Sequence, residues 1–200
     1  MRIQLIIVVL AILLFTHYAS AQSWGLGIRL GDPSGLSIKK YSKGHAWEFS
    51  LGRTHLFSNR GYYNDRYDNW YNDQHYGHKA HEFIAYRSTV PIGLQVHYLI
   101  QKPFADAAGL GWYFGFGGQL RTQRIEYDYR YKVENGPDWV YVTNEAVTET
   151  DLGVDGVIGL EYLFPEAPIA IFLDATLFME LFNDPFVFNA QGGAGVRYTF

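Results

Sequence analysis

Three histidines, His75, His78 and His81, recur at every third position in a segment that also holds Asp68 and Asp73. Imidazole and carboxylate groups at such close spacing are ligands for Zn²⁺ or Cu²⁺. The chain has no cysteine that would complete the set. Because the sequence does not define the shape of this segment, we predict neither a metal site nor a cofactor.

A serine nucleophile needs a histidine base within reach. The candidates are Ser50 or Ser88 with His97 and one of several carboxylates. Their spacing matches no recognisable catalytic motif. We therefore interpret His97 as a hydrogen-bonded interior residue and predict that the chain is not an enzyme.

Opposite charges in nearly equal number share one face of the predicted strands. Apolar and polar residues alternate along these strands, and a period of two separates an outer face from an inner one. The inner face carries Arg29, Lys39, Arg87, Arg121 and Arg197 against Glu48, Asp155, Glu161, Asp174 and Glu180. Because an unpaired buried charge is costly, we predict an ion-pair network that fills the interior. A gated, narrow ion path is the alternative interpretation of the same residues.

Aromatic residues are concentrated in Thr54–His81, which breaks the alternation and is predicted to be a long loop. They are Tyr62, Tyr63, Tyr67, Trp70, Tyr71 and Tyr76, set between Asn, Asp and Gly. Tyrosine supplies contact area at a low entropy cost, so this mixture is typical of protein-recognition loops and also suits carbohydrate contact. The alternative is a solvated loop folded onto the rim of the molecule.

The period of two predicts eight strands. Their ranges are Trp24–Leu30, Gly35–Tyr41, Ala46–Arg53, Glu82–Gln101, Leu110–Arg121, Thr150–Leu163, Pro168–Leu181 and Phe188–Phe200. Pro91 lacks a backbone donor, so the fourth strand should be irregular there. Connections alternate between short and long, which predicts short turns at one end of an up-and-down barrel and longer loops at the other.

The chemistry of the fifth strand inverts at Thr122, where outward positions turn from aromatic to charged. We interpret this as the level at which lipid gives way to water. Thr122–Val133 and Trp139–Thr150 should then form a hairpin that continues two strands beyond the bilayer. Its other face carries Tyr127, Tyr129 and Tyr131, which need cover from the tyrosine-rich loop or from a partner.

The two ends of the chain carry sorting information. Residues 1–21 contain an early Arg2, an apolar run and Ala19-Ser20-Ala21, the layout of a cleaved secretory signal peptide. The apolar run is shorter than the ~20 residues of a membrane helix. Val196, Tyr198 and Phe200 share the outward face of the last strand. They resemble the C-terminal signal that the barrel-insertion machinery recognises.

Composition fits the same class of protein. Aromatic residues make up 18% of the chain and charged residues 18%, and there are 21 glycines, as suits a transmembrane β-barrel. The formal net charge of −4 argues against nucleic-acid binding. Residues 22–200 resemble the small eight-stranded outer-membrane barrels of the OmpA/OmpX type. The likeness lies in architecture and the end signal.

That resemblance implies a pore-less, all-β barrel in the bacterial outer membrane, surrounded by lipid. Its role would be structural or interactive, with a protein or glycan partner at the extracellular loops. Small barrels also include lipid A deacylases and acyltransferases, which are the alternative. The candidates Ser50, Ser88 and His97 fall on the predicted luminal face, whereas a deacylase attacks from the lipid side.

Overall fold

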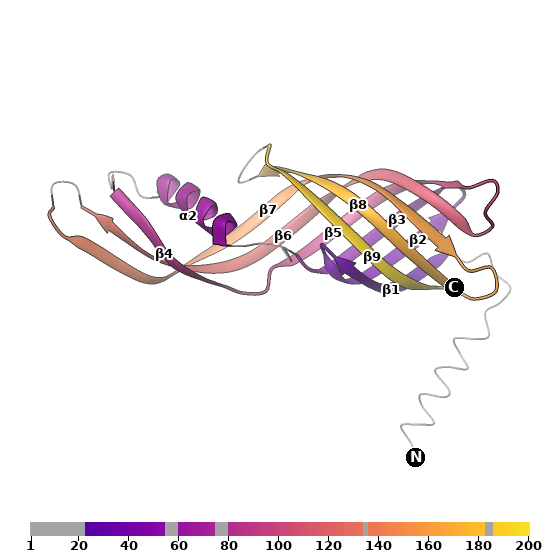
Figure 1. The fold of residues 1–200 in the computed structure, drawn as a ribbon, viewed down its shortest axis with the longest axis horizontal. Helices are drawn as coiled ribbons and strands as arrows, with labels where there is room; N and C mark the ends of the chain where they lie inside the picture. Colours follow the sequence, from indigo (N-terminus) through magenta and orange to yellow (C-terminus); the bar gives the residue numbers. More distant parts are fainter. Residues whose placement is uncertain (1–22, 55–59, 75–79, 134–135, 183–185) are drawn as a thin grey trace, which may run out of the picture.

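Alternating apolar and polar residues form a closed, all-antiparallel β-barrel (Figure 1). The computed structural model describes residues 23–54, 60–74, 80–133, 136–182 and 186–200. The predicted signal peptide lies outside these ranges. The elements are β1 (Trp24–Gly31), β2 (Ser34–Ser42), β3 (His45–Arg53), α2 (Arg60–Gln74), β4 (Ala80–Ser88), β5 (Ile92–Pro103), β6 (Leu110–Lys132), β7 (Trp139–Leu163), β8 (Ile169–Phe182) and β9 (Phe188–Thr199).

Eight strands form the ring, in the order β6-β5-β3-β2-β1-β9-β8-β7, and pairing of β7 with β6 closes it. The first and last strands meet in register, for example at Ile28 and Val196. The predicted up-and-down barrel is thus confirmed. Within the described residues, no helix is long and apolar enough to cross a membrane.

Apolar side chains form a belt around the outside of the ring. Leu26, Ile28 and Phe116 are among the exposed members. An aromatic pair, Trp47 with Tyr98 at a centroid distance of 5.1 Å, lies close to the turn between β2 and β3 at residues 43–44. An apolar belt with aromatic residues at its border and a polar interior is the arrangement of outer-membrane barrels.

β6 and β7 extend well beyond the belt, to the left in Figure 1. Their pairing runs from Leu110–Tyr162 to Lys132–Trp139, with one irregularity between Tyr127 and Tyr129. The predicted hairpin is therefore confirmed as a continuation of two strands of the ring, and its place above a bilayer stays a prediction. A ninth strand, β4, pairs with the outer part of β6 and gives a three-stranded sheet, β4-β6-β7. We call it the extracellular sheet, after the orientation predicted from the sequence.

Two predicted elements differ in the structure. Glu82–Gln101 is not one strand, because the chain leaves the ladder at residues 89–91 and forms β4 and β5 on either side. The predicted irregularity at Pro91 lies in this gap. Thr54–His81 is not simply a loop, because it contains α2 and the first residues of β4.

Connections at the C-terminal end are short, at residues 43–44, 104–109 and 164–168. The opposite end carries the extracellular sheet and α2. The difference between the two ends follows the predicted pattern of connection lengths.

Candidate functional site

The base of the lumen is organised around Glu161 on β7. Its carboxylate accepts hydrogen bonds from Lys39 Nζ at 2.9 Å, Arg197 Nη1 at 2.9 Å, the Tyr41 hydroxyl at 2.9 Å and Gln101 Nε2 at 3.0 Å. Lys39 and Arg197 are completely buried. A charge removed from water needs such a full set of partners, and here it has them.

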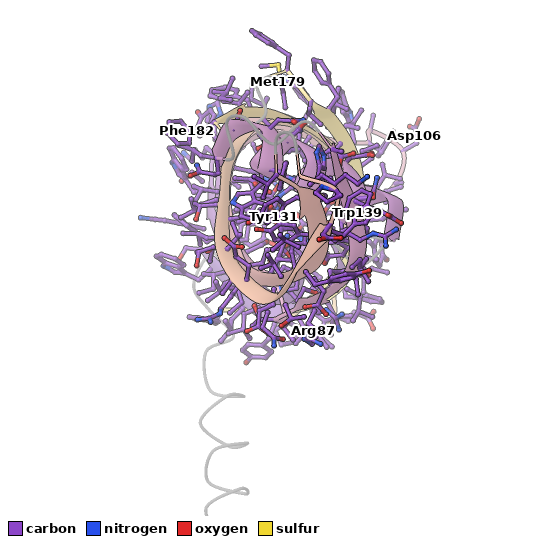
Figure 2. All side chains as sticks on the ribbon, turned by 90° about the vertical axis from the view of Figure 1, so that its left-hand side faces the viewer. Arg87, Asp106, Tyr131, Trp139, Met179 and Phe182 are labelled. Carbon is purple, nitrogen blue, oxygen red and sulfur yellow. The ribbon has the colours of Figure 1, made fainter. Side chains whose placement is uncertain are left out.

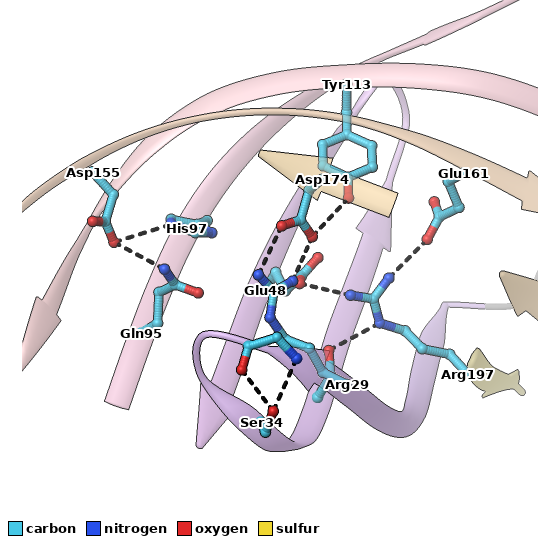
Figure 3. Close-up of polar contacts among 12 residues, drawn as sticks. Arg29, Ser34, Glu48, Gln95, His97, Tyr113, Asp155, Glu161, Asp174 and Arg197 are labelled. Atoms are coloured by element: carbon cyan, nitrogen blue, oxygen red, sulfur yellow. Dashed lines mark hydrogen bonds and ion pairs between the residues drawn. The ribbon is translucent and has the colours of Figure 1, made fainter. Parts of the chain in front are cut away.

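A second group of ion pairs lies beside the first (Figure 3). Both terminal nitrogens of Arg29 donate hydrogen bonds to the Asp174 carboxylate, and Nη2 lies 2.7 Å from Oδ1. Arg197 Nη2 lies 2.6 Å from Glu48 Oε1. The Tyr113 hydroxyl donates to Asp174 at 3.4 Å. Strands far apart in the sequence are thereby linked across the interior, which large buried side chains occupy.

His97 lies in the lumen and contacts Asp155, with Nε2 3.1 Å from Oδ2. Gln95 Nε2 donates to the same oxygen at 3.3 Å. Within the described part of the chain, no hydrogen bond joins His97 to a serine. Ser50 is a buried luminal residue, whereas Ser88 lies on β4 and donates to the Tyr63 hydroxyl at 3.3 Å. The structure thus does not assemble the catalytic set considered from the sequence.

Arg87 is not part of the luminal network, and that prediction is wrong. Its exposed guanidinium lies 3.1 Å from Asp128 and 3.7 Å from Glu126 on the outer face of the extracellular sheet. A register shift between Phe83 and Ala85 and the break before β5 change which face each residue occupies. In Figure 2, which looks along the molecule from this end, Arg87 lies at the periphery.

The mouth of the barrel below the extracellular sheet holds a cluster of charges, of which the sequence analysis identified only Glu180. Arg66 of α2 is buried, and its Nη2 lies 3.0 Å from Asp151 Oδ1 and 3.3 Å from Glu180 Oε2. Its Nε lies 3.9 Å from Glu149 Oε2. Burial raises the pKa of Glu149 above its usual range. We call Arg66 and these three carboxylates the mouth cluster.

Arg121 lies near this level but has a different environment. Its guanidinium stacks on Phe178 at 3.9 Å, and Nη2 donates to Gln119 at 3.3 Å. Its pairing neighbour on β7 is Asp151. Among the described residues, no carboxylate oxygen lies within ion-pair distance of Arg121. Arg121 therefore forms no ion pair with the carboxylates of the mouth cluster.

Helix α2 covers the inner face of the extracellular sheet. Tyr63, Tyr67 and Tyr71 are buried in one cluster with three residues of β6, namely Ile125, Tyr127 and Tyr129. Burial raises the pKa of the Tyr71 hydroxyl to about 12, and it also raises the pKa values of Tyr67 and Tyr129. The predicted cover over the hairpin is confirmed. It is supplied by a helix, not by a loop.

This packing corrects the set of predicted partner-binding tyrosines. The buried members, Tyr63, Tyr67, Tyr71, Tyr127 and Tyr129, form the core of the extracellular part. Trp70 and Tyr131 are partly buried against the same cluster. Tyr62 lies within α2, and Tyr76 lies outside the described residues. The spacing of Tyr63, Tyr67, Trp70 and Tyr71 is that of one helix face, which was the available evidence for α2.

One histidine of the predicted metal set is described. His81 stacks on Tyr71 at 4.1 Å, and its Nε2 lies 3.5 Å from Asp68. His75 and His78 lie outside the described residues. Within those residues, no three or more His, Cys, Asp or Glu side chains form a group able to hold a metal ion.

The extracellular sheet has an open edge on β7. Trp139–Glu149 pairs with β6 on one side, and β8 joins β7 only from Leu152 onward. No strand of the described residues pairs with the other side of the segment above Leu152. On its outer face, Arg130 of β6 contacts Glu82, the Trp139 ring and the Tyr141 hydroxyl.

The residues of the predicted insertion signal lie at the opposite end of the molecule. Val196 and Phe200 are exposed, and the rings of Tyr198 and Phe200 stack at 6.2 Å. The Phe200 backbone N–H donates to the Trp24 carbonyl at 2.8 Å. These residues are on the outer surface, where a recognition factor has access. Their recognition itself stays a prediction.

No protein-family model matches the chain, and no curated protein matches it in sequence. Among solved structures, Ail, the attachment invasion locus protein of Yersinia pestis, is similar over 90% of this chain and 97% of that protein. The TM-score is 0.48 and the identity 9%. Neisserial surface protein A (NspA) is similar over 88% of this chain and 94% of that protein, with a TM-score of 0.41 and 10% identity.

Proposed function

We propose that this protein is a binding barrel of the bacterial outer membrane and that its extracellular sheet captures a protein partner. The observation that carries the proposal is the open edge of β7 over Trp139–Glu149, which stands beyond the lipid-facing belt. Unpaired backbone groups on an exposed strand are a template for an added strand. An extended segment of a partner would bind there through its main chain.

The rest of the molecule supports a role in presenting this edge. The luminal ion pairs and large buried side chains favour a rigid, filled barrel that holds the sheet, and not a conducting channel. The packing of α2 on Tyr127 and Tyr129 stiffens the sheet, since a bare two-stranded hairpin is marginal in water. The partner-binding surface is then the edge and the outer face, because the tyrosine cluster is covered.

A photo-cross-linking amino acid at Tyr141 tests the proposal on intact cells incubated with extracellular protein mixtures. Tyr141 is 63% exposed on the edge strand, and the matched control, Phe116, is 66% exposed in the lipid-facing belt. We expect discrete protein adducts from position 141 and none from position 116. A correctly inserted barrel that gives no adduct at position 141 or elsewhere along the β7 edge would contradict the proposed role.

A further inference from the structure

A pocket of about 350 Å³ opens between α2 and β7. Trp70 and Asp73 of α2 line one side, Thr148 and Glu149 of β7 line the other, and Phe182 at the end of β8 contributes to the wall. A volume of this size is enough for a long side chain or a small ligand. We call this space the α2–β7 pocket.

Two carboxylates, those of Asp73 and Glu149, line the α2–β7 pocket. Arg66 lines it too, but its guanidinium is shared by the three carboxylates of the mouth cluster. Glu149 is additionally bonded by the Tyr127 hydroxyl at 3.3 Å and by Gln123 at 3.5 Å, and neither of these groups carries a positive charge. A cation entering the pocket would meet the exposed Asp73 carboxylate, which forms no ion pair with a described residue.

The aromatic residues of the pocket walls also favour one kind of cation. Trp70 and the exposed Phe182 are aromatic, and an aromatic wall suits the alkyl stem and the charged head of lysine or arginine. A carboxylate at the end of the stem would receive a charge-assisted hydrogen bond. The combination of aromatic walls and carboxylates therefore fits a basic side chain better than an acidic or purely apolar one.

The pocket adjoins the open edge. Residues 147–150 of β7 form part of its lining, and on the opposite side they pair with β6, from Val147–Ile125 to Thr150–Thr122. A strand added along this edge would send alternate side chains to opposite faces of the sheet. One of them would lie at the pocket entrance.

We infer that the partner is an extended polypeptide segment that pairs with the open edge of β7 and inserts a lysine or arginine side chain into the α2–β7 pocket. This inference rests on the proposed function of the edge. It adds a chemical requirement, a basic residue at one position of the bound strand. Electrostatic complementarity would then make binding at the edge specific for certain sequences, which backbone pairing alone does not do.

The test uses the full barrel in detergent micelles and fluorescent seven-residue peptides of alternating threonine and valine. The central residue is lysine, norleucine or glutamate, and a fourth peptide is the lysine peptide with alternate backbone nitrogens methylated. Binding is followed by fluorescence anisotropy. Asp73→Asn and Glu149→Gln remove one pocket carboxylate each. Asp65→Asn, an exposed α2 carboxylate that does not line the pocket, is the control.

We expect the lysine peptide to bind about tenfold more tightly than the norleucine peptide, and the glutamate peptide to bind most weakly. Asp73→Asn and Glu149→Gln should each reduce the preference for lysine, Asp65→Asn should not, and backbone methylation should abolish binding. Equal binding of the lysine and norleucine peptides, both lost on methylation, would overturn the pocket inference and leave strand addition standing. Binding of the lysine peptide that survives methylation would overturn strand addition at this edge, and with it the inference.

Discussion

Replacing Arg66 by alanine tests what holds α2 on the barrel. The guanidinium is buried and lies 3.0 Å from Asp151 and 3.3 Å from Glu180, with Glu149 at 3.9 Å. Removing it leaves three buried carboxylates without their shared cation. The protein can relieve this cost by lifting α2, because water then reaches the carboxylates.

The magnitude follows from two opposing contributions. Breaking a buried ion pair by removing one partner costs about 3–5 kcal/mol. The tyrosine cluster, which still favours docking, is unchanged by the substitution. We therefore expect α2 to stay docked but with a docking free energy reduced by about 3 kcal/mol, the lower end of that range. Since 1.4 kcal/mol is a factor of about ten, transient opening should become about 100-fold more frequent.

Hydrogen exchange of the α2 amides measures this opening directly. In Arg66→Ala the α2 amides should exchange about 100-fold faster, while those of β1, β2 and β9 should not change and the barrel should stay heat-modifiable on gels. The control is Arg87→Ala, which removes an exposed guanidinium and should have little effect. Adding Glu180→Gln to Arg66→Ala should restore part of the protection. Unchanged exchange of α2 in Arg66→Ala would refute the view that the mouth cluster anchors the helix.

Four further predictions address the core, the charge, the orientation and the assembly of the protein. Tyr127→Ala should cost about 3–5 kcal/mol of α2 docking, as for other buried aromatic truncations, yet leave the barrel heat-modifiable; loss of that gel shift would place the ring in the barrel core. The raised pKa of Glu149 means that docking of α2 favours the protonated carboxyl group. Its contribution to docking is fully present below its unfolded pKa of about 4.3 and is lost as the pH rises through the higher pKa of the folded protein. Glu149→Gln should therefore flatten the pH dependence of α2 exchange, corrected for intrinsic rates, and a variant that titrates like the parent would disprove this. An epitope tag inserted after Pro137 should be accessible on intact cells and one after Ala167 should not, and the reverse pattern would invert the orientation. Phe200→Ala should lower outer-membrane levels more than its lost packing, ~1–3 kcal/mol at most, would explain; normal levels would show that the end residues are no insertion signal.

The ring and the extent of its apolar belt could be predicted from the sequence because each rests on a local pattern. Alternation along each strand assigns residues to the outside or the lumen, and the change from Leu120 to Thr122 marks where the apolar belt ends. Arg87 was misplaced because a single register shift, between Phe83 and Ala85, inverts the faces of the residues that follow. Pro91 predicted an irregularity but not how many residues would leave the ladder.

Helix α2 could not be predicted by composition, because Asn, Asp and Gly surround its aromatic residues and favour turns. The helix is stable in the folded protein because Tyr63, Tyr67 and Tyr71 find an apolar face on β6 that itself needs cover. The apolar faces of α2 and β6 match only when the two segments come together in the folded protein, so neither segment's own sequence reveals the match. The helical spacing of the tyrosines was present in the sequence, but only the structure shows that the segment follows it.

The charges inside the molecule explain why α2 belongs to the fold. Among the described residues, the buried cations are Arg29, Lys39, Arg66, Arg121 and Arg197. The buried carboxylates, apart from Asp32 in the β1–β2 turn, are Glu48, Glu149, Asp151, Asp155, Glu161, Asp174 and Glu180. At the base of the lumen, Glu48, Glu161 and Asp174 meet cations that come from other strands across the interior. At the mouth the strands contribute the carboxylates of Asp151 and Glu180, and a cation that contacts both, Arg66, comes from the helix. Arg66 therefore ties the extracellular part to the barrel, so that a rigid edge on β7 depends on an ion pair that the strand pattern alone does not contain.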